Sequence, residues 1–180
     1  NGYNFTTAAP AASTSPYITK WLMNGYYQST GKTAALATDF LGGEAGVSPV
    51  EGSASSSGTT WKSYSSTSNT INLGAYYNMP KNCAGYAFAY VYSPKAQSAT
   101  FSLGSDDGTK VWLNGTLVFT LDTSRACADG SNKVPVSLNA GWNRLLVKVS
   151  QSSGNWKFIF KTVDSSSNMI PGITYSLSPQ

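Results

Sequence analysis

Two adjacent aspartates, Asp106 and Asp107, are the residues in this sequence best suited to chemistry. They lie in the turn Ser105-Asp106-Asp107-Gly108, and no other two acidic residues are neighbours in the chain. Neighbouring carboxylates repel each other unless a cation, a hydrogen-bond donor or water compensates. Three roles stay open: accepting backbone N–H bonds in the turn, ligating calcium with loop carbonyls and Asp129, or accepting hydrogen bonds from a ligand's hydroxyls.

The composition excludes several other kinds of chemistry. The chain contains no His, which rules out Ser-His-Asp and Cys-His catalysis and the familiar His and Cys zinc sites. Glycoside hydrolysis needs two carboxylates on either side of a sugar ring, and Asp106 and Asp107 are poorly placed for that because they are neighbours. We therefore expect no intrinsic catalysis.

The charge and hydropathy patterns also exclude two classes of partner. The net charge of +4 comes from Lys and Arg residues scattered singly along the chain, so we expect no nucleic-acid partner. No apolar stretch is long enough for a transmembrane helix, so we expect no membrane partner.

Aromatic residues beside polar loops are the second set of candidates for a binding site. A sugar ring presents a flat C–H face that stacks on Tyr or Trp, while nearby polar groups bind its hydroxyls. The candidates of this kind are Trp61, Tyr64, Tyr76 and Tyr77.

A hairpin is expected directly after the paired aspartates. Asn114-Gly115 lies between two apolar runs, and both residues tolerate the positive φ of a type I′ turn. Residues 110–113 should therefore pair antiparallel with residues 116–119. A regular register puts Val118 on one face of the hairpin and Phe119 on the other.

Alternating patterns predict an all-β fold, a two-layer antiparallel β-sandwich. Residues 86–92 alternate large aromatic with small side chains, so all their rings share one face, which we expect to be a core layer; an open aromatic shelf is the alternative. Residues 142–150 and 156–163 alternate in the same way, with Arg144 and Lys148 pointing outward.

The organisation predicted is a linker-like segment, residues 1–16, followed by one domain, residues 17–180. The first segment is rich in Ala, Ser, Thr and Pro without periodicity. No signal segment opens the chain, so we expect a mature or excised piece of a secreted, extracellular protein. Cys83 and Cys127 are even in number and are expected to form a disulfide, two unrelated thiols being the alternative.

Three segments, residues 21–27, 104–115 and 140–149, together resemble the accessory β-sandwich modules of secreted polysaccharide-degrading enzymes. The Asp-Asp-Gly before a strand is also similar to the protective-antigen-type sugar-binding sandwich of yeast adhesins. The resemblance implies a jelly roll and non-catalytic carbohydrate binding. It further implies that Asp106 and Asp107 hold a calcium ion that touches the sugar.

The expected function is binding of a plant or microbial polysaccharide, which targets an attached catalytic module to its substrate. Two alternatives remain: a structural or adhesion domain that contacts proteins or cell surfaces, and a small carboxylate-dependent enzyme acting on glycans. The chain departs from the enzyme-linked pattern at Cys83, at Cys127 and in the Tyr76-Tyr77 loop, so the identity of the sugar does not follow from the resemblance.

Overall fold

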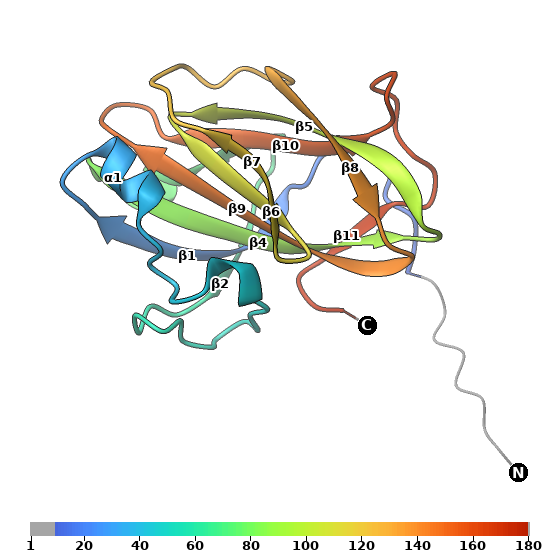
Figure 1. Ribbon diagram of the computed structural model, residues 1–180, viewed down its shortest axis with the longest axis horizontal. Helices are drawn as coiled ribbons and strands as arrows, with labels where there is room; N and C mark the ends of the chain where they lie inside the picture. Colours follow the sequence, from blue (N-terminus) through green and yellow to red (C-terminus); the bar gives the residue numbers. More distant parts are fainter. Residues whose placement is uncertain (1–9, 180) are drawn as a thin grey trace, which may run out of the picture.

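Two antiparallel sheets stack face to face in the computed structural model, which describes residues 10–179 (Figure 1). The larger sheet has seven strands in the order β2-β1-β4-β9-β6-β7, with β11 also paired to β4. Its strands are β1 (Lys20–Gln28), β2 (Lys62–Ser65), β4 (Cys83–Ser93), β6 (Thr109–Leu113), β7 (Thr116–Leu121), β9 (Gly141–Gln151) and β11 (Thr174–Ser176).

The smaller sheet has four strands in the order β3-β10-β5-β8. They are β3 (Thr70–Asn72), β5 (Gln97–Asp106), β8 (Asn132–Leu138) and β10 (Lys157–Val163). Three short helices complete the elements: α1 (Lys32–Ala37), the 3-10 helix η1 (Glu44–Gly46) and α2 (Leu73–Tyr76). The prediction of an all-β, two-layer antiparallel sandwich is confirmed, and the jelly roll stays a prediction.

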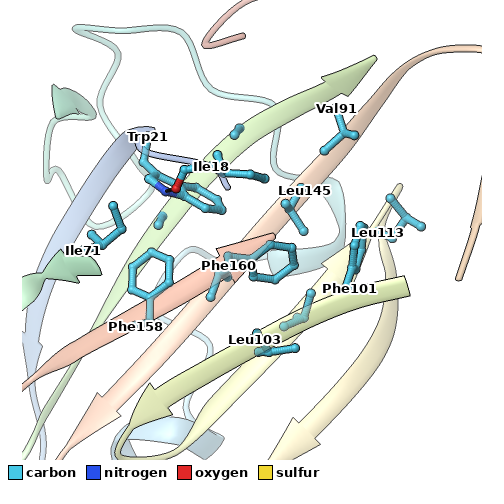
Figure 2. Packing of buried hydrophobic residues seen from close by; sticks show 14 of the residues in the cluster. Ile18, Trp21, Ile71, Val91, Phe101, Leu103, Leu113, Leu145, Phe158 and Phe160 are labelled. Atoms are coloured by element: carbon cyan, nitrogen blue, oxygen red, sulfur yellow. Dashed lines mark hydrogen bonds between the residues drawn. The ribbon is translucent and has the colours of Figure 1, made fainter. Parts of the chain in front are cut away.

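The core lies between the two sheets, where the apolar faces of the alternating strands meet. Trp21 of β1 is fully buried, with its ring centroid 5.3 Å from that of Phe158 and 5.9 Å from that of Phe160. Figure 2 shows these rings together with Leu145 of β9 and Phe101 of β5. Each strand therefore contributes every second side chain to one shared interior.

A second apolar cluster lies on the outer face of the larger sheet. Residues 29–61, which we call the cap, include α1 and η1, and α1 packs against β4 and β9 (Figure 1). The rings of Tyr86, Phe88 and Tyr90 are buried in this cluster. The aromatic face of residues 86–92 is thus a core layer, as predicted.

The β6–β7 hairpin has the predicted turn but a shifted register. Asn114 and Gly115 have φ values of 52° and 88°, as a type I′ turn requires. The register shifts one pair beyond Trp112, so that Val111 lies opposite Phe119 instead of Val118. Both Val118 and Phe119 consequently pack against the main core, and the prediction that they lie on opposite faces is wrong.

The predicted disulfide is wrong, because both cysteines are free. Cys83 begins β4 and is buried in the core between the sheets. Cys127 lies in the loop between β7 and β8, where its thiol is near Lys157 and Asp106 of the smaller sheet. An even number of cysteines does not show that the segments carrying Cys83 and Cys127 lie close enough together to form a disulfide.

The start of the described chain is attached to the sandwich by hydrogen bonds. Ser13 N donates to Ile173 O at 3.2 Å, and Pro16 O accepts from Tyr175 Oη at 2.7 Å and from Thr162 N at 3.0 Å. The first nine residues of the predicted linker lie outside the described residues. None of the helices within residues 10–179 has the length and apolar character to cross a membrane.

Candidate functional site

A pocket of about 290 Å³ opens beside β1, β2 and α2 and contains two of the predicted aromatic residues. We call it the tyrosine pocket. Its lining residues are Met23, Gly25, Thr59, Thr60, Lys62, Tyr76 and Tyr77. The volume is at the small end of the range for ligand pockets and is large enough for a sugar ring.

Four tyrosines form a continuous set of ring contacts at this pocket. Tyr76 makes edge-to-face contacts with Tyr77 at 4.6 Å and with Tyr64 at 5.2 Å between ring centroids. Tyr26 contacts Tyr77 at 5.9 Å and is 45% exposed. The structure therefore brings Tyr64 next to the adjacent pair Tyr76 and Tyr77 and adds Tyr26 to the set.

Glycines in the sheet allow Tyr77 to lie close against the sandwich. A Cβ at Gly85 of β4 would lie 3.1 Å from the Trp156 ring and 3.3 Å from the Tyr77 ring. Tyr77 in turn stacks on Trp156, with 5.4 Å between their centroids. Gly25 has φ +135°, and a Cβ there would lie 3.5 Å from the Tyr77 hydroxyl. Any larger residue at Gly25 would be strained and would narrow the pocket.

The hydroxyl of Tyr77 is buried and has no hydrogen-bond partner within the described residues. Burial raises the pKa of Tyr77 well above its usual value, so the hydroxyl stays protonated. The Tyr77 hydroxyl is therefore a hydrogen-bond donor without an acceptor among the described residues.

Trp61 is placed differently from the other predicted aromatics. Its side chain is only 3% exposed and packs in the cap cluster, with its ring centroid 6.3 Å from that of Phe88. This burial contradicts the expectation of an exposed ring at Trp61. Trp61 comes directly before Lys62, the first residue of β2, and neighbouring side chains of an extended segment point to opposite faces. Trp61 therefore faces the cap, and Lys62 faces the tyrosine pocket.

The paired aspartates lie at the end of β5 and have different surroundings, although a single cis peptide bond joins them. Asp107 is 5% exposed and accepts three hydrogen bonds: Oδ1 accepts from Arg125 N at 3.1 Å, and Oδ2 accepts from Ser152 N at 3.0 Å and Ser152 Oγ at 2.9 Å. Asp107 thus has the first of the three predicted roles, that of an acceptor for backbone N–H groups.

Asp106 is 7% exposed, and its side chain accepts no hydrogen bond from any residue from 10 to 179. It lies opposite Lys157 of β10 in the register of the smaller sheet. Burial and the charge of Asp107 raise the pKa of the Asp106 carboxyl, and Lys157 opposes this shift. The carboxylate is therefore incompletely compensated by its surroundings.

The loop between β7 and β8 covers the outer face of β5 next to Asp106. Gly104 makes this close approach possible, because a Cβ there would lie 2.0 Å from Ala128 O. Arg125 fixes the loop further, since its Nε donates to Ser105 O at 3.0 Å and its Nη2 donates to Ser105 Oγ at 3.0 Å.

Asp129 lies in the same loop but is not brought to the aspartate pair as a third acidic ligand. Its Oδ2 accepts from Tyr17 Oη at 2.6 Å and from Lys161 Nζ at 2.9 Å. These bonds outweigh the effect of burial and lower the pKa of Asp129. Over the described part of the chain, no three side chains of His, Cys, Asp or Glu are grouped as metal ligands.

A calcium ion still matches the chemistry of the oxygens at Asp106 and Asp107. The Asp106 oxygens accept no hydrogen bond, and Asp107 Oδ1 accepts only one. Calcium takes six to eight oxygen ligands and accepts carbonyls and water as well as carboxylates.

The other acidic side chains all have hydrogen-bond partners. Seven of the eight in the sequence accept at least one hydrogen bond, Asp106 being the exception; these seven are Asp39, Glu44, Glu51, Asp107, Asp122, Asp129 and Asp164.

A larger groove of about 760 Å³ lies elsewhere, between the β6–β7 hairpin and strands β5 and β8. Its lining includes hydroxyls and amides such as Thr116, Ser137 and Asn139, and no aromatic ring. A sugar ring would have no stacking surface there, so the tyrosine pocket is the better candidate.

Two residues at this site, Tyr26 and Lys62, are not among the predicted contacts. Tyr26 and Tyr27 are neighbours in β1, so their side chains point to opposite faces, and Tyr26 is the exposed one. Tyr26 contacts the Tyr77 ring but does not line the pocket itself. Lys62 follows Trp61 directly and carries the only charge in the pocket lining. The alternation of Thr60, Lys62 and Tyr64 could have placed Lys62 on the same face as Tyr64.

Comparisons with known proteins gave matches only among solved structures. No family model matches the chain, and no curated protein matches it. A PA14 sugar-binding domain from an RTX adhesin is similar at 12% identity with a TM-score of 0.42, covering 54% of this chain and 54% of that one.

The PA14 domain of the antifreeze protein MpAFP is similar at 16% identity with a TM-score of 0.42, covering 89% of this chain and 73% of that one. A β-glucosidase from Kluyveromyces marxianus is similar at 11% identity with a TM-score of 0.47, covering 80% of this chain and 16% of that one.

Proposed function

We propose that this domain binds a carbohydrate without catalysis and that the tyrosine pocket is the binding site. The observation that carries the proposal is a series of ring contacts that runs from Tyr26 through Tyr77 and Tyr76 to Tyr64. Tyr76 and Tyr77, the middle two rings, line a small pocket. Exposed aromatic rings supply a stacking surface at a low entropic cost, and the polar groups beside them fix the orientation of the sugar.

The polar groups needed for such a site are present. The hydroxyls of Thr59 and Thr60 and the ammonium group of Lys62 belong to residues that line the pocket, and these groups can form hydrogen bonds with sugar hydroxyls.

The purpose of polysaccharide binding by this domain is part of the same proposal. A small secreted module of this kind would hold an attached catalytic module against a plant or microbial polysaccharide. Hydrolysis of the polysaccharide would be the task of the attached module.

Calcium is proposed as a second component, held by Asp106 and Asp107. Trp156 links the two regions, since it stacks on Tyr77 while the next residue, Lys157, lies opposite Asp106. A calcium ion would neutralise the aspartate pair and stabilise the β7–β8 loop.

Affinity electrophoresis tests the proposed function. The purified chain is run through gels that contain one soluble polysaccharide each, with calcium in one set and EDTA in the other, beside a protein that binds no sugar. We expect at least one polysaccharide to retard the chain, with no release of reducing sugar. Normal mobility in every gel would contradict carbohydrate binding and favour the adhesion alternative.

A further inference from the structure

We propose that the tyrosine pocket selects acidic sugars, those that carry a carboxylate or a sulfate group, and that the Lys62 ammonium group binds the negatively charged group. The inference rests on the proposed sugar-binding function and adds the chemical class of the ligand. Its starting point is that Lys62 is the only charged residue in the lining of the pocket.

The position of Lys62 follows from the pairing of β2 with β1. Lys62 lies opposite Met23, and Tyr64 lies opposite Trp21. Side chains two residues apart share a face of a strand, so Lys62 projects from the same face as Tyr64. At the edge of the sheet, this face turns toward α2, where Tyr76 forms the other side of the pocket.

Lys62 is not engaged by the protein itself. Its ammonium group makes no hydrogen bond or ion pair with residues 10–179, whereas the three ion pairs in this part of the chain engage Lys32, Lys148 and Lys161. The pocket lining contains no Asp or Glu. A negative charge on the ligand would therefore be the partner of Lys62.

The acidic residue next to β2 does not neutralise the pocket. Glu51 Oε1 accepts from the main-chain N and the hydroxyl of Ser63, the residue after Lys62. Because neighbouring side chains of a strand point to opposite faces, the Ser63 hydroxyl and Glu51 lie on the face away from the tyrosines. The pocket side of β2 keeps a net positive charge.

An acidic sugar would use both features of the pocket at once. Its ring would pack against Tyr76, and its charged group would reach Lys62. Lys62 is solvent-exposed, so the contribution of its charge is moderate and depends on the salt concentration.

The test compares two polymers with the same sugar backbone, polygalacturonate and highly methyl-esterified pectin, in which the carboxylates are blocked. An array of glycans that carry uronate, sialate or sulfate groups, each next to its neutral counterpart, extends the comparison. We expect the acidic member of the best-bound pair to bind more tightly and Lys62→Gln to weaken its binding about fivefold. Lys95→Gln, at an exposed lysine in the β4–β5 turn, removes the same charge and should leave binding unchanged.

The failures of the two proposals are distinguishable. Tight binding of neutral glycans that Lys62→Gln leaves unaffected would overturn the selection of acidic sugars and keep the sugar-binding function. Absence of binding to every glycan would overturn the function and this inference together. Equal weakening by Lys62→Gln and Lys95→Gln would show a general effect of net charge and would also overturn the role of Lys62.

Discussion

Asp106 and Asp107 show how two identical neighbours can have opposite energetic roles. Asp107 accepts three hydrogen bonds, one from Arg125 and two from Ser152. Asp106 accepts none from residues 10–179 and is almost completely buried. The sequence places both aspartates in one turn, but the surrounding loops determine which of the two carboxylates receives hydrogen bonds.

This difference predicts an unusual pH dependence for Asp106→Asn. Burial, followed by the charge of Asp107, raises the pKa of Asp106 above its unfolded value. The unfolded chain therefore releases this proton first, and stability falls as the pH rises from about 4 through the folded pKa. In EDTA at pH 7, Asp106→Asn should raise the melting temperature, and the gain should disappear below about pH 4.

Asp122→Asn is the matched control, because the hydrogen bond from Lys32 lowers the pKa of Asp122. Stability from Asp122 is present above the unfolded pKa of about 4 and is lost as the pH falls through the folded value. This variant should lower the melting temperature at pH 7.

Added calcium should raise the melting temperature of the wild type and not that of Asp106→Asn. A destabilised Asp106→Asn in EDTA would contradict the description of Asp106 as uncompensated.

At the scale of elements, the strands were predictable and the cap was not. The alternation in β4, β9 and β10 separates the two faces of each strand directly, because a strand's side chains have a period of two. It does not show that β4 and most of β9 are buried on both faces. The cap has no such pattern, and its place over the outer face depends on long-range contacts. For this reason Lys148 was expected to point into solvent, although its side chain is fully buried.

Lys148 attaches the cap to the outer face of β9. Its Nζ donates to Thr38 O and, at 3.0 Å, to Glu44 Oε1, and it lies 5.2 Å from the centroids of the Phe40 and Tyr86 rings. The predicted outward direction was correct, but alternation does not reveal what covers a face. Burial lowers the pKa of Lys148, and the charge of Glu44 opposes this shift.

Lys148→Ala should lower the free energy of unfolding by about 3–5 kcal/mol, because it leaves the buried end of Glu44 without its cation. Urea denaturation measures the loss, and hydrogen exchange should become faster in the cap than in β9. Lys110→Ala removes a half-exposed lysine on the neighbouring strand, opposite Lys148, and should change stability by no more than about 0.5 kcal/mol. Equal effects of the two variants would count against Lys148 as the attachment of the cap.

At the scale of the whole molecule, the sandwich is held together by its core without a covalent link between Cys83 and Cys127. Burial raises the pKa of Cys83 to about 12 and also raises that of Cys127, so neither thiol is activated. A reducing agent should leave the melting temperature unchanged. A disulfide would be revealed by a fall of about 4 °C or more on reduction, since its loss costs about 2–5 kcal/mol.

The candidate site also shows what the whole fold adds to the sequence. Local pattern identified Tyr64, Tyr76 and Tyr77 because they flank polar loops, and the fold joins them into one ring cluster. The same reasoning selected Trp61, whose burial depends on the unpredicted cap. Residue type can therefore indicate a candidate for contact with a sugar. Whether the aromatic ring is exposed depends on which distant segment of the chain packs against it.

Isothermal titration with the best-bound oligosaccharide tests the central claim, that sugar binds at the tyrosine pocket, most directly. Tyr76→Ala should weaken binding about tenfold or more, because it removes an accessible ring from the pocket. Tyr92→Ala, which removes a half-buried tyrosine from the opposite end of β4, should bind as the wild type does once its folding is verified. Unchanged affinity of Tyr76→Ala, together with a loss of binding in Asp106→Asn, would contradict the account and move the site to the aspartate pair.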